Sequence, residues 1–129
     1  MSAKKNVLIV TDGTETVDSI AASIGGKLSD FKVKITNSQE FEGTDLLPAD
    51  IFFLGCEKAS PESFSYLEDI LSHINLASRK CGIFSTNEKA INYLRKITKD
   101  CEADMAEPLL SESITRDSLE KWVKTLTAS

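Results

Sequence analysis

The sequence predicts an α/β domain of three layers, in which helices cover both faces of a five-stranded parallel sheet with the strand order 2-1-3-4-5. Short apolar runs alternate along the chain with segments of helical periodicity, and right-handed crossovers leave few arrangements for such a chain. Three runs are apolar throughout and belong at the centre of the sheet, whereas two are more polar and belong at its edges. The length of 129 residues suits one domain, so residues 1–129 are expected to form a single unit.

The strands follow from two kinds of pattern. Continuous apolar runs are typical of parallel strands that are buried on both faces. These runs are 7–10, 51–54 and 81–84. Residues 31–36 instead alternate, which is typical of an edge strand, and Val33 and Ile35 are expected to point into the core. Residues 103–106 are a weaker candidate for the other edge, and Pro108 ends it.

Four helices are expected, because apolar residues recur at helical spacing in four segments. Their apolar faces are formed by Val17, Ile20, Ala21, Ile24 and Leu28; by Phe64, Leu67, Ile70, Leu71 and Ile74; by Ala90, Ile91, Leu94 and Ile97; and by Leu119, Trp122, Val123 and Leu126. Pro61 fits just before or within the first turn of the second helix, and Thr115 fits the N-cap of the last. Residues 37–50 form a connection with room for one turn of helix.

Charge and composition limit the partners. The net charge of −5 argues against nucleic acid, since phosphate binding needs a basic surface, but it permits docking on a basic protein. The apolar run near the N-terminus is too short for a signal peptide or a membrane span. Cys56, Cys81 and Cys101 form no CxxC pair, which fits a reducing compartment. We therefore expect a cytoplasmic monomer with no membrane partner, in which Cys81 lies in the core and Cys101 is exposed.

Ligands of open parallel sheets bind at the carboxyl ends of the strands, where the winding reverses, here between the first and third strands. The loops at this position are 11–16, 55–60 and 85–87, called here the first, second and third loops. The candidate binding residues are Thr11, Asp12, Gly13, Thr14, Glu15 and Thr16 of the first loop; Gly55, Cys56 and Glu57 of the second; and Ser85, Thr86 and Asn87 of the third.

The first loop carries three hydroxyls and a glycine immediately before a helix N-terminus, where free N–H groups attract anions. It could therefore hold a phosphate, or it could be only a capped turn, and the six residues leave both open. Its acids, Asp12 and Glu15, decide between the two. A carboxylate about 6 Å from a phosphate charge, at an effective dielectric near 20, repels it by roughly 3 kcal/mol. The helix dipole returns only about 0.3–1 kcal/mol, so a phosphate binds only if both acids point into solvent.

Three segments together resemble the flavodoxin family. Residues 11–16, TDGTET, are similar to the family's phosphate loop, [T/S]-x-[T/S]-G-x-T, with Gly and Thr exchanged. Residues 46–56 are similar to the approach to the family's third strand and the Gly-Cys that ends it, and residues 106–109 resemble its G-E-P-L. The resemblance implies a flavodoxin-like fold and non-covalent binding of FMN, with the phosphate in the first loop and the flavin ring between the second and third loops. It also implies that the protein passes single electrons to a redox protein partner and is not an enzyme.

The sequence departs from the family at the ring. The second loop contains no aromatic residue, and the third is too short for the usual ring-binding insertion. Loss of two stacking partners would weaken binding about 5- to 150-fold. Two hypotheses stay open: a small FMN-binding electron-transfer protein, or a flavodoxin-fold domain that has lost FMN and acts as a binding or regulatory module. Binding of another phosphate-bearing ligand is a weaker third.

Other kinds of site are not indicated. His73 is the single histidine and is expected on the solvent side of its helix, away from the three loops. A Ser-His or Cys-His catalytic pair and a tetrahedral metal site would both need histidine elsewhere. Cys56 ends a buried strand, where it either packs as a small apolar residue or contacts the ligand.

Overall fold

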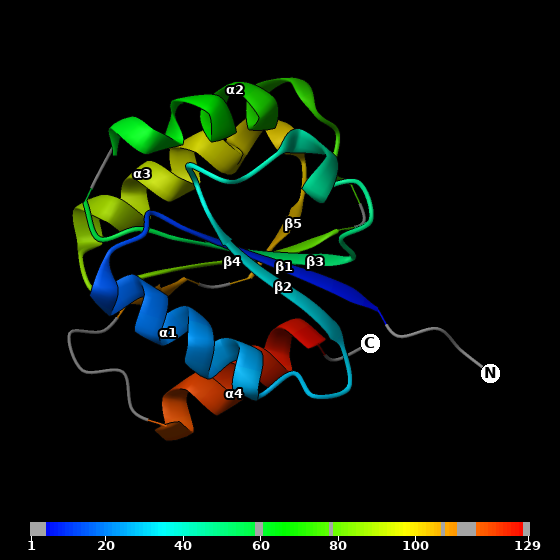
Figure 1. Cartoon of the computed structure of the whole chain (residues 1–129), viewed down its shortest axis with the longest axis vertical. Coiled ribbons are helices and arrows are strands. Elements are labelled where there is room, and N and C mark those ends of the chain that lie inside the picture. Colours follow the sequence, from blue (N-terminus) through cyan, green and yellow to red (C-terminus); the bar gives the residue numbers. More distant parts are fainter. Residues whose placement is uncertain (1–4, 59–60, 78, 107, 111–115, 128–129) are drawn as a thin grey trace.

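A parallel sheet runs through the middle of the molecule in the computed structural model (Figure 1). The structure describes residues 5–58, 61–77, 79–106, 108–110 and 116–127, with the backbone alone for 116–118 and 127. The five predicted strands are β1 (Asn6–Thr11), β2 (Lys32–Asn37), β3 (Ile51–Gly55), β4 (Lys80–Ser85) and β5 (Asp104–Met105). Their order is β2-β1-β3-β4-β5 and all pairs are parallel, so the predicted topology is confirmed.

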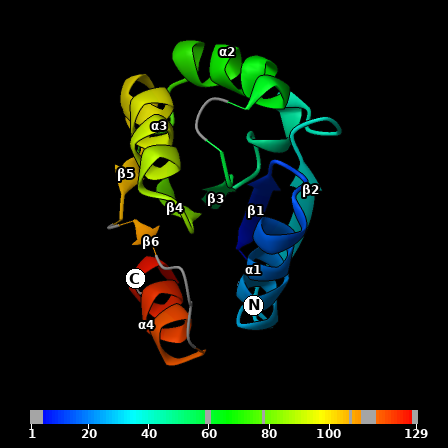
Figure 2. The same cartoon turned by 90° about the vertical axis from the view of Figure 1, so that its left-hand side faces the viewer.

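Helices cover both faces of this sheet, as Figures 1 and 2 show. Helices α1 (Glu15–Gly26) and α4 (Arg116–Thr127) lie on one face, and α2 (Ser65–His73) and α3 (Glu88–Thr98) lie on the other. Short 3₁₀ turns are η1 (Gly43–Asp45), η2 (Glu62–Phe64) and η3 (Lys99–Cys101). The first of these is the expected turn in the β2–β3 connection, and Pro61 lies directly before η2, as predicted. The predicted N-cap Thr115 lies outside the described residues.

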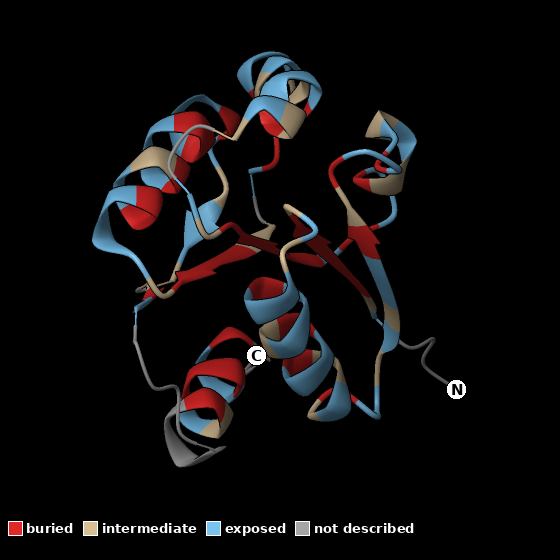
Figure 3. Cartoon of the chain, turned by 60° about the vertical axis from the view of Figure 1, so that its left-hand side comes forward, coloured by how far each residue is buried: buried red, intermediate tan, exposed pale blue. Residues whose placement is uncertain are grey.

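The core consists of two apolar layers, one on each face of the sheet, and Figure 3 shows the buried strands between them. Alternate residues of a strand point to opposite faces, so Phe52 and Leu54 pack under α2 and α3 while Phe53 packs under α1 and α4. Trp122 of α4 meets the ring of Phe53 edge-on, with ring centroids 5.4 Å apart. Both faces need apolar residues, and this explains the continuous apolar runs.

The edge strand β2 differs from its prediction at one residue. Val33 is partly buried against the α1 layer, as expected, but Ile35 is 48% exposed. A Cβ placed on Gly25 of α1 would lie 3.2 Å from Ile35 Cδ1, so Ile35 lies against the backbone of the helix. Ile35 therefore faces α1 as predicted, but because glycine offers no side chain there it remains half uncovered and does not join the core.

Cys101 is fully buried, so its predicted exposure was wrong. The 3₁₀ turn η3 directs the thiol inward, where Sγ donates a hydrogen bond to the carbonyl of Thr98 at 3.1 Å. The carbonyl of Cys101 also accepts a 2.7 Å bond from the N–H of Leu76, which fixes the turn against the end of the α2 segment. Cys81, in contrast, lies in the core as predicted.

A sixth strand, β6 (Leu109–Leu110), was not predicted. It pairs with β4 at Phe84 and Ser85, whereas β5 pairs with β4 near its start at Lys80 and Cys81. Pro108, between them, has no N–H to give to a ladder, which is consistent with an edge that pairs in two pieces.

Candidate functional site

The three predicted loops lie together at the carboxyl edge of the sheet. Thr11 at the end of β1 is in register with Gly55 at the end of β3, and Gly55 is in register with Phe84 of β4. The N–H of Glu57 in the second loop donates to Asp12 Oδ2 of the first loop at 2.8 Å. The fold therefore brings the first and second loops into direct contact and places the third beside the second.

Asp12 points inward and joins the first two loops. Its Oδ1 accepts hydrogen bonds from the N–H of Thr14 at 3.1 Å and from the hydroxyl of Thr14 at 2.7 Å. Its Oδ2 accepts the bond from Glu57. The carboxylate thus accepts from an N–H group of each loop and from one hydroxyl of the first, and a carboxylate in this inward position would repel a bound phosphate.

A second carboxylate, that of Asp18, also faces the first loop. The hydroxyl of Thr11, a buried side chain, donates to Asp18 Oδ1 at 2.6 Å, and Thr11 Oγ1 accepts from the N–H of Gly13 at 3.2 Å. Asp18 is in the first turn of α1, where its N–H bonds to the carbonyl of Thr14 at 2.8 Å. Asp18 was not among the site residues predicted from the sequence. Its position in the first helical turn, directly after a hydroxyl-rich loop, was the signal that could have indicated it.

The other residues of the first loop have simpler roles. Gly13 has a φ of +82°, in the left-handed region that favours glycine, so it forms the turn. Thr14 occupies the N-cap position of α1, but its side chain makes no capping bond because the hydroxyl is turned to Asp12. Glu15 and Thr16 are exposed. Of the two acids in this loop, Glu15 therefore points to solvent and Asp12 does not.

The second loop is packed tightly against the sheet. A Cβ on Gly55 would lie 2.3 Å from ring atoms of Phe84, so only glycine fits beside that ring. Cys56 is fully buried, and burial, with the nearby Asp12 carboxylate, raises the pKa of its thiol to about 12. A thiol with this pKa stays protonated at neutral pH, which, with its burial, favours a packing role for Cys56 over a reactive one. Glu57 is half-buried, and residues 59 and 60 lie outside the described residues.

The third loop uses its polar side chains locally. Ser85 is buried, and its Oγ accepts a hydrogen bond from the N–H of Asn87 at 3.1 Å. Asn87 is the N-cap of α3, where its Oδ1 accepts from the N–H of Lys89 at 2.8 Å. Thr86 between them is half-buried. The loop therefore turns directly into α3 and forms no insertion over the first loop.

Solved flavodoxin structures match nearly the whole chain. A short-chain flavodoxin associated with a bacterial microcompartment matches with a TM-score of 0.85 and 18% identity, over 98% of this chain and 100% of its own. A flavodoxin of Streptococcus pneumoniae gives 0.81 and 18%, over 95% and 97% of the two chains. The chain has the flavodoxin-like fold. A Fusobacterium nucleatum flavodoxin bound to flavin mononucleotide gives 0.75 and 12%, over 95% and 96%. No protein-family model and no curated protein matches the sequence.

The flavodoxin-like fold raises the question of whether the first loop fits the phosphate of FMN. The hydroxyls of Thr11 and Thr14 already donate to the carboxylates of Asp18 and Asp12. At about 6 Å and an effective dielectric near 20, each carboxylate would repel one phosphate charge by roughly 3 kcal/mol, against about 0.3–1 kcal/mol from the helix dipole. In this arrangement the loop does not fit a phosphate, because the hydroxyls that would bind it already donate to the partly buried carboxylate of Asp12 and to the exposed carboxylate of Asp18.

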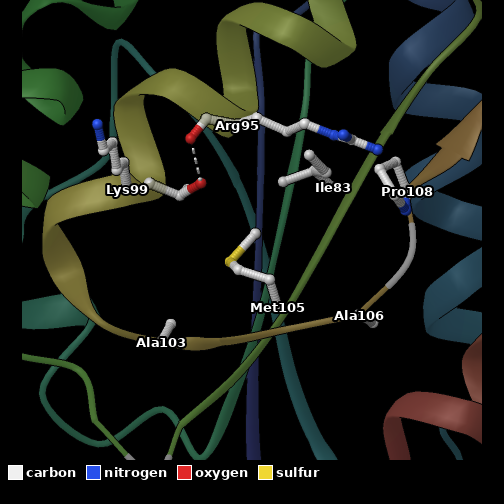
Figure 4. Close-up of a pocket in the computed structure, with 8 residues that line it drawn as sticks. Ile83, Arg95, Lys99, Ala103, Met105, Ala106 and Pro108 are labelled. Atoms are coloured by element: carbon white, nitrogen blue, oxygen red, sulfur yellow. Dashed lines mark hydrogen bonds between the residues drawn. The ribbon is translucent and has the colours of Figure 1, made fainter.

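A separate cavity of about 400 Å³ lies beside β5, and no residue of the three loops lines it (Figure 4). Arg95 and Lys99 on α3 and its extension border it, and Ile83, Met105 and Pro108 supply apolar lining. Both cations stand near the C-terminal end of α3, where positive charge offsets the helix dipole, so their position has a structural explanation.

Other kinds of site find no support in the described part of the chain. His73 is 76% exposed, as predicted, with Nδ1 lying 3.7 Å from Asp69 Oδ1. No group of three His, Cys, Asp or Glu side chains suited to a metal ion occurs among the described residues. None of the helices described there has the length and apolar character needed to span a membrane.

Proposed function

We propose that this chain is a flavodoxin-fold binding module that works without FMN and carries out no chemistry of its own. The proposal depends on one observation: Asp12 and Asp18 accept the hydroxyl hydrogens of Thr14 and Thr11 in the first loop. In a loop that binds an anion these hydroxyls would be free to donate to it. Here two carboxylates take that place, and they also disfavour any other phosphate-bearing ligand.

The second and third loops support the same proposal. The described part of the second loop, through Lys58, has no aromatic side chain, and the third loop leads directly into the N-cap of α3 at Asn87. Stacking contacts contribute about 0.5–1.5 kcal/mol each beyond the burial of apolar area. A flavin ring at this edge would lack these contacts, so the ring side of the site would not compensate for the repulsion on the phosphate side.

A small FMN-binding electron-transfer protein that works with a redox partner is the second candidate. Two observations favour it. A flavodoxin of similar structure, that of Fusobacterium nucleatum, is bound to flavin mononucleotide. Thr16 is exposed in the first turn of α1, at the end of the helix that attracts anions.

Titration with FMN separates the two candidates. We expect the purified protein to be colourless and to leave flavin fluorescence unchanged at tens of micromolar FMN, because both carboxylates repel the phosphate. In a variant with both Asp12→Asn and Asp18→Asn this repulsion is gone, so any affinity for FMN or inorganic phosphate should increase. The matched control is Glu15→Gln, which removes an exposed acid from the same loop and should change nothing. A yellow protein, or saturable quenching by the unmodified chain, would establish the electron carrier instead.

A further inference from the structure

An open apolar groove lies between the β2–β3 connection and α2, and no residue of the three loops lines it. Its apolar lining residues are Leu47, Tyr66, Ile70 and Ile74, and Glu42 and Asp69 also line it. Its volume is about 750 Å³, within the usual range for binding pockets. We call it the α2 groove.

The walls of the α2 groove are held in place by direct contacts. The N–H of Gly43 in η1 donates to the hydroxyl of Tyr66 at 3.0 Å. A Cβ on Gly43 would lie 3.1 Å from Ile70 Cδ1, so the turn packs closely on the helix at this point. The ring of Tyr66 also packs against the buried ring of Phe41, with centroids 5.8 Å apart. The groove is therefore formed before any partner arrives, which lowers the entropic cost of binding.

Two large apolar side chains are left in water at this groove. Leu47 is 61% exposed and Tyr66 is 47% exposed. The other exposed large apolar residues of the described chain, Ile35, Met105 and Leu110, belong to β2, β5 and β6 and do not line this groove. Apolar side chains exposed together in a preformed depression indicate an interaction site more strongly than apolar residues scattered singly.

The charges at the α2 groove are acidic. Glu42 and Asp69 line it together with His73, and no lysine or arginine does so among the residues described. Lys34 of β2 is held by Asp45, with Nζ and Oδ1 2.7 Å apart. An apolar groove that acidic residues also line is complementary to a segment that carries apolar residues on one face and Lys or Arg beside them. A second copy of this chain, itself of net charge −5, is a poorer match.

We propose that the α2 groove binds a basic amphipathic helix of a partner protein, with the partner's apolar face on Leu47, Tyr66 and Ile70 and its cations toward Glu42 and Asp69. This is the helix-in-groove mode of recognition, in which apolar residues spaced at i, i+3, i+4 and i+7 enter a preformed groove. The inference gives the binding module proposed above a surface and a class of partner.

The test uses a fluorescein-labelled amphipathic helical peptide of about 18 residues, built from Leu and Lys, and measures its anisotropy with the full chain. We expect saturable binding, and Leu47→Ser should weaken it about fivefold or more because apolar contact area is lost. The matched control is Leu110→Ser, which removes an equally large exposed apolar side chain outside the groove and should change the affinity less than about twofold. Asp69→Asn should weaken binding, and the weakening should shrink as salt is added.

The remaining outcomes are decisive. Equal loss in Leu47→Ser and Leu110→Ser, or equal affinity for a Leu/Glu peptide of the same pattern, would overturn the proposal, because binding would then not depend on this groove or its charge. Self-association that Leu47→Ser abolishes, seen by sedimentation, would also overturn it and assign the groove to a second copy. Each variant is titrated with FMN in parallel. Flavin binding with intact peptide binding would overturn the proposed function and leave the groove assignment standing. Absence of both flavin binding and peptide binding would overturn the groove assignment and leave the proposed function standing.

Discussion

The centre of the sheet and the loops at its carboxyl edge meet within β3, yet different forces hold them. Residues from Ile51 to Leu54 are buried among apolar side chains on both faces. Three residues later, the N–H of Glu57 is fixed by the carboxylate of Asp12. Apolar packing has little directional preference and tolerates many sequences, whereas a binding loop depends on where a few polar groups point. The difference explains how a chain 12–18% identical to the three flavodoxins named above has their fold while the hydroxyls of its first loop donate to two carboxylates.

The two regions should therefore respond differently to substitution. A change that adds volume in the packed centre should affect the stability of the whole domain, because a close-packed interior has no room to relax. A change among the loop carboxylates should cost less stability and act mainly on which ligands the edge accepts.

The largest effect is expected from Gly55→Ala, at the boundary of the two regions. The new methyl group would lie 2.3 Å from ring atoms of Phe84, a fully buried side chain, so the ring must move within the core. We expect a loss of about 3 kcal/mol or more in the free energy of unfolding, measured by urea denaturation. The control is Gly26→Ala in the last turn of α1, where nothing lies within 4 Å of the added Cβ. This control should leave the protein as stable or slightly more stable. Equal effects would mean that the centre is not tightly packed.

The sequence predicts the central strands of the sheet, but it does not predict features that depend on tertiary contacts. The strands of the centre follow from their residue types, because a run such as 51–54 can be satisfied only where both faces are covered. The polar segment around Cys101 looks like a surface loop, and only the η3 turn and its bond to Leu76 bury the thiol. The pairing of β6 similarly depends on a tertiary contact with β4 that no local pattern records.

The candidate site was predictable in position but not in detail. The strand order placed the first and second loops side by side, and the structure confirms that they touch. The directions of Asp12 and Asp18 depend instead on side-chain rotamers and on partners in another loop, which have no periodicity in the sequence. Electrostatics predicts which direction of a carboxylate would exclude a phosphate, but only the hydrogen bonds of the folded loop show which direction Asp12 and Asp18 take.

A smaller effect is expected from pH, through Cys56. Burial raises the pKa of its thiol from an ordinary 9.0 to about 12. Between these values the unfolded chain loses the proton while the folded chain keeps it, so the free energy of unfolding should fall as pH rises above 9. At pH 10.5 the loss from this group is about 2 kcal/mol. Burial also raises the pKa of Cys81 and Cys101, so their contributions have the same sign. Urea titrations at pH 8 and pH 10.5 should show a smaller difference for Cys56→Ala than for the unmodified chain, and an unchanged difference would place the thiol in contact with water.

The smallest effect on stability, and the one that isolates the loops from the centre, is expected from Asp12→Ala. The substitution leaves the N–H and hydroxyl of Thr14 and the N–H of Glu57 without their common acceptor. These groups are only partly buried, so water can replace part of what is lost, and we expect a cost of about 1–2 kcal/mol in urea denaturation. Glu15→Ala, which removes an exposed acid from the same loop, should cost only the helix-dipole contribution of about 0.5 kcal/mol. Amide hydrogen exchange adds a spatial test: protection at Leu8 and Phe52 should fall only by the global loss of stability, and the further loss at Thr14 and Glu57 should be larger, because the bond network of the edge does not hold the centre together. Loss of protection at Leu8 and Phe52 to the same degree would show that the loop carboxylate supports the whole sheet, and the distinction between the two regions would fail.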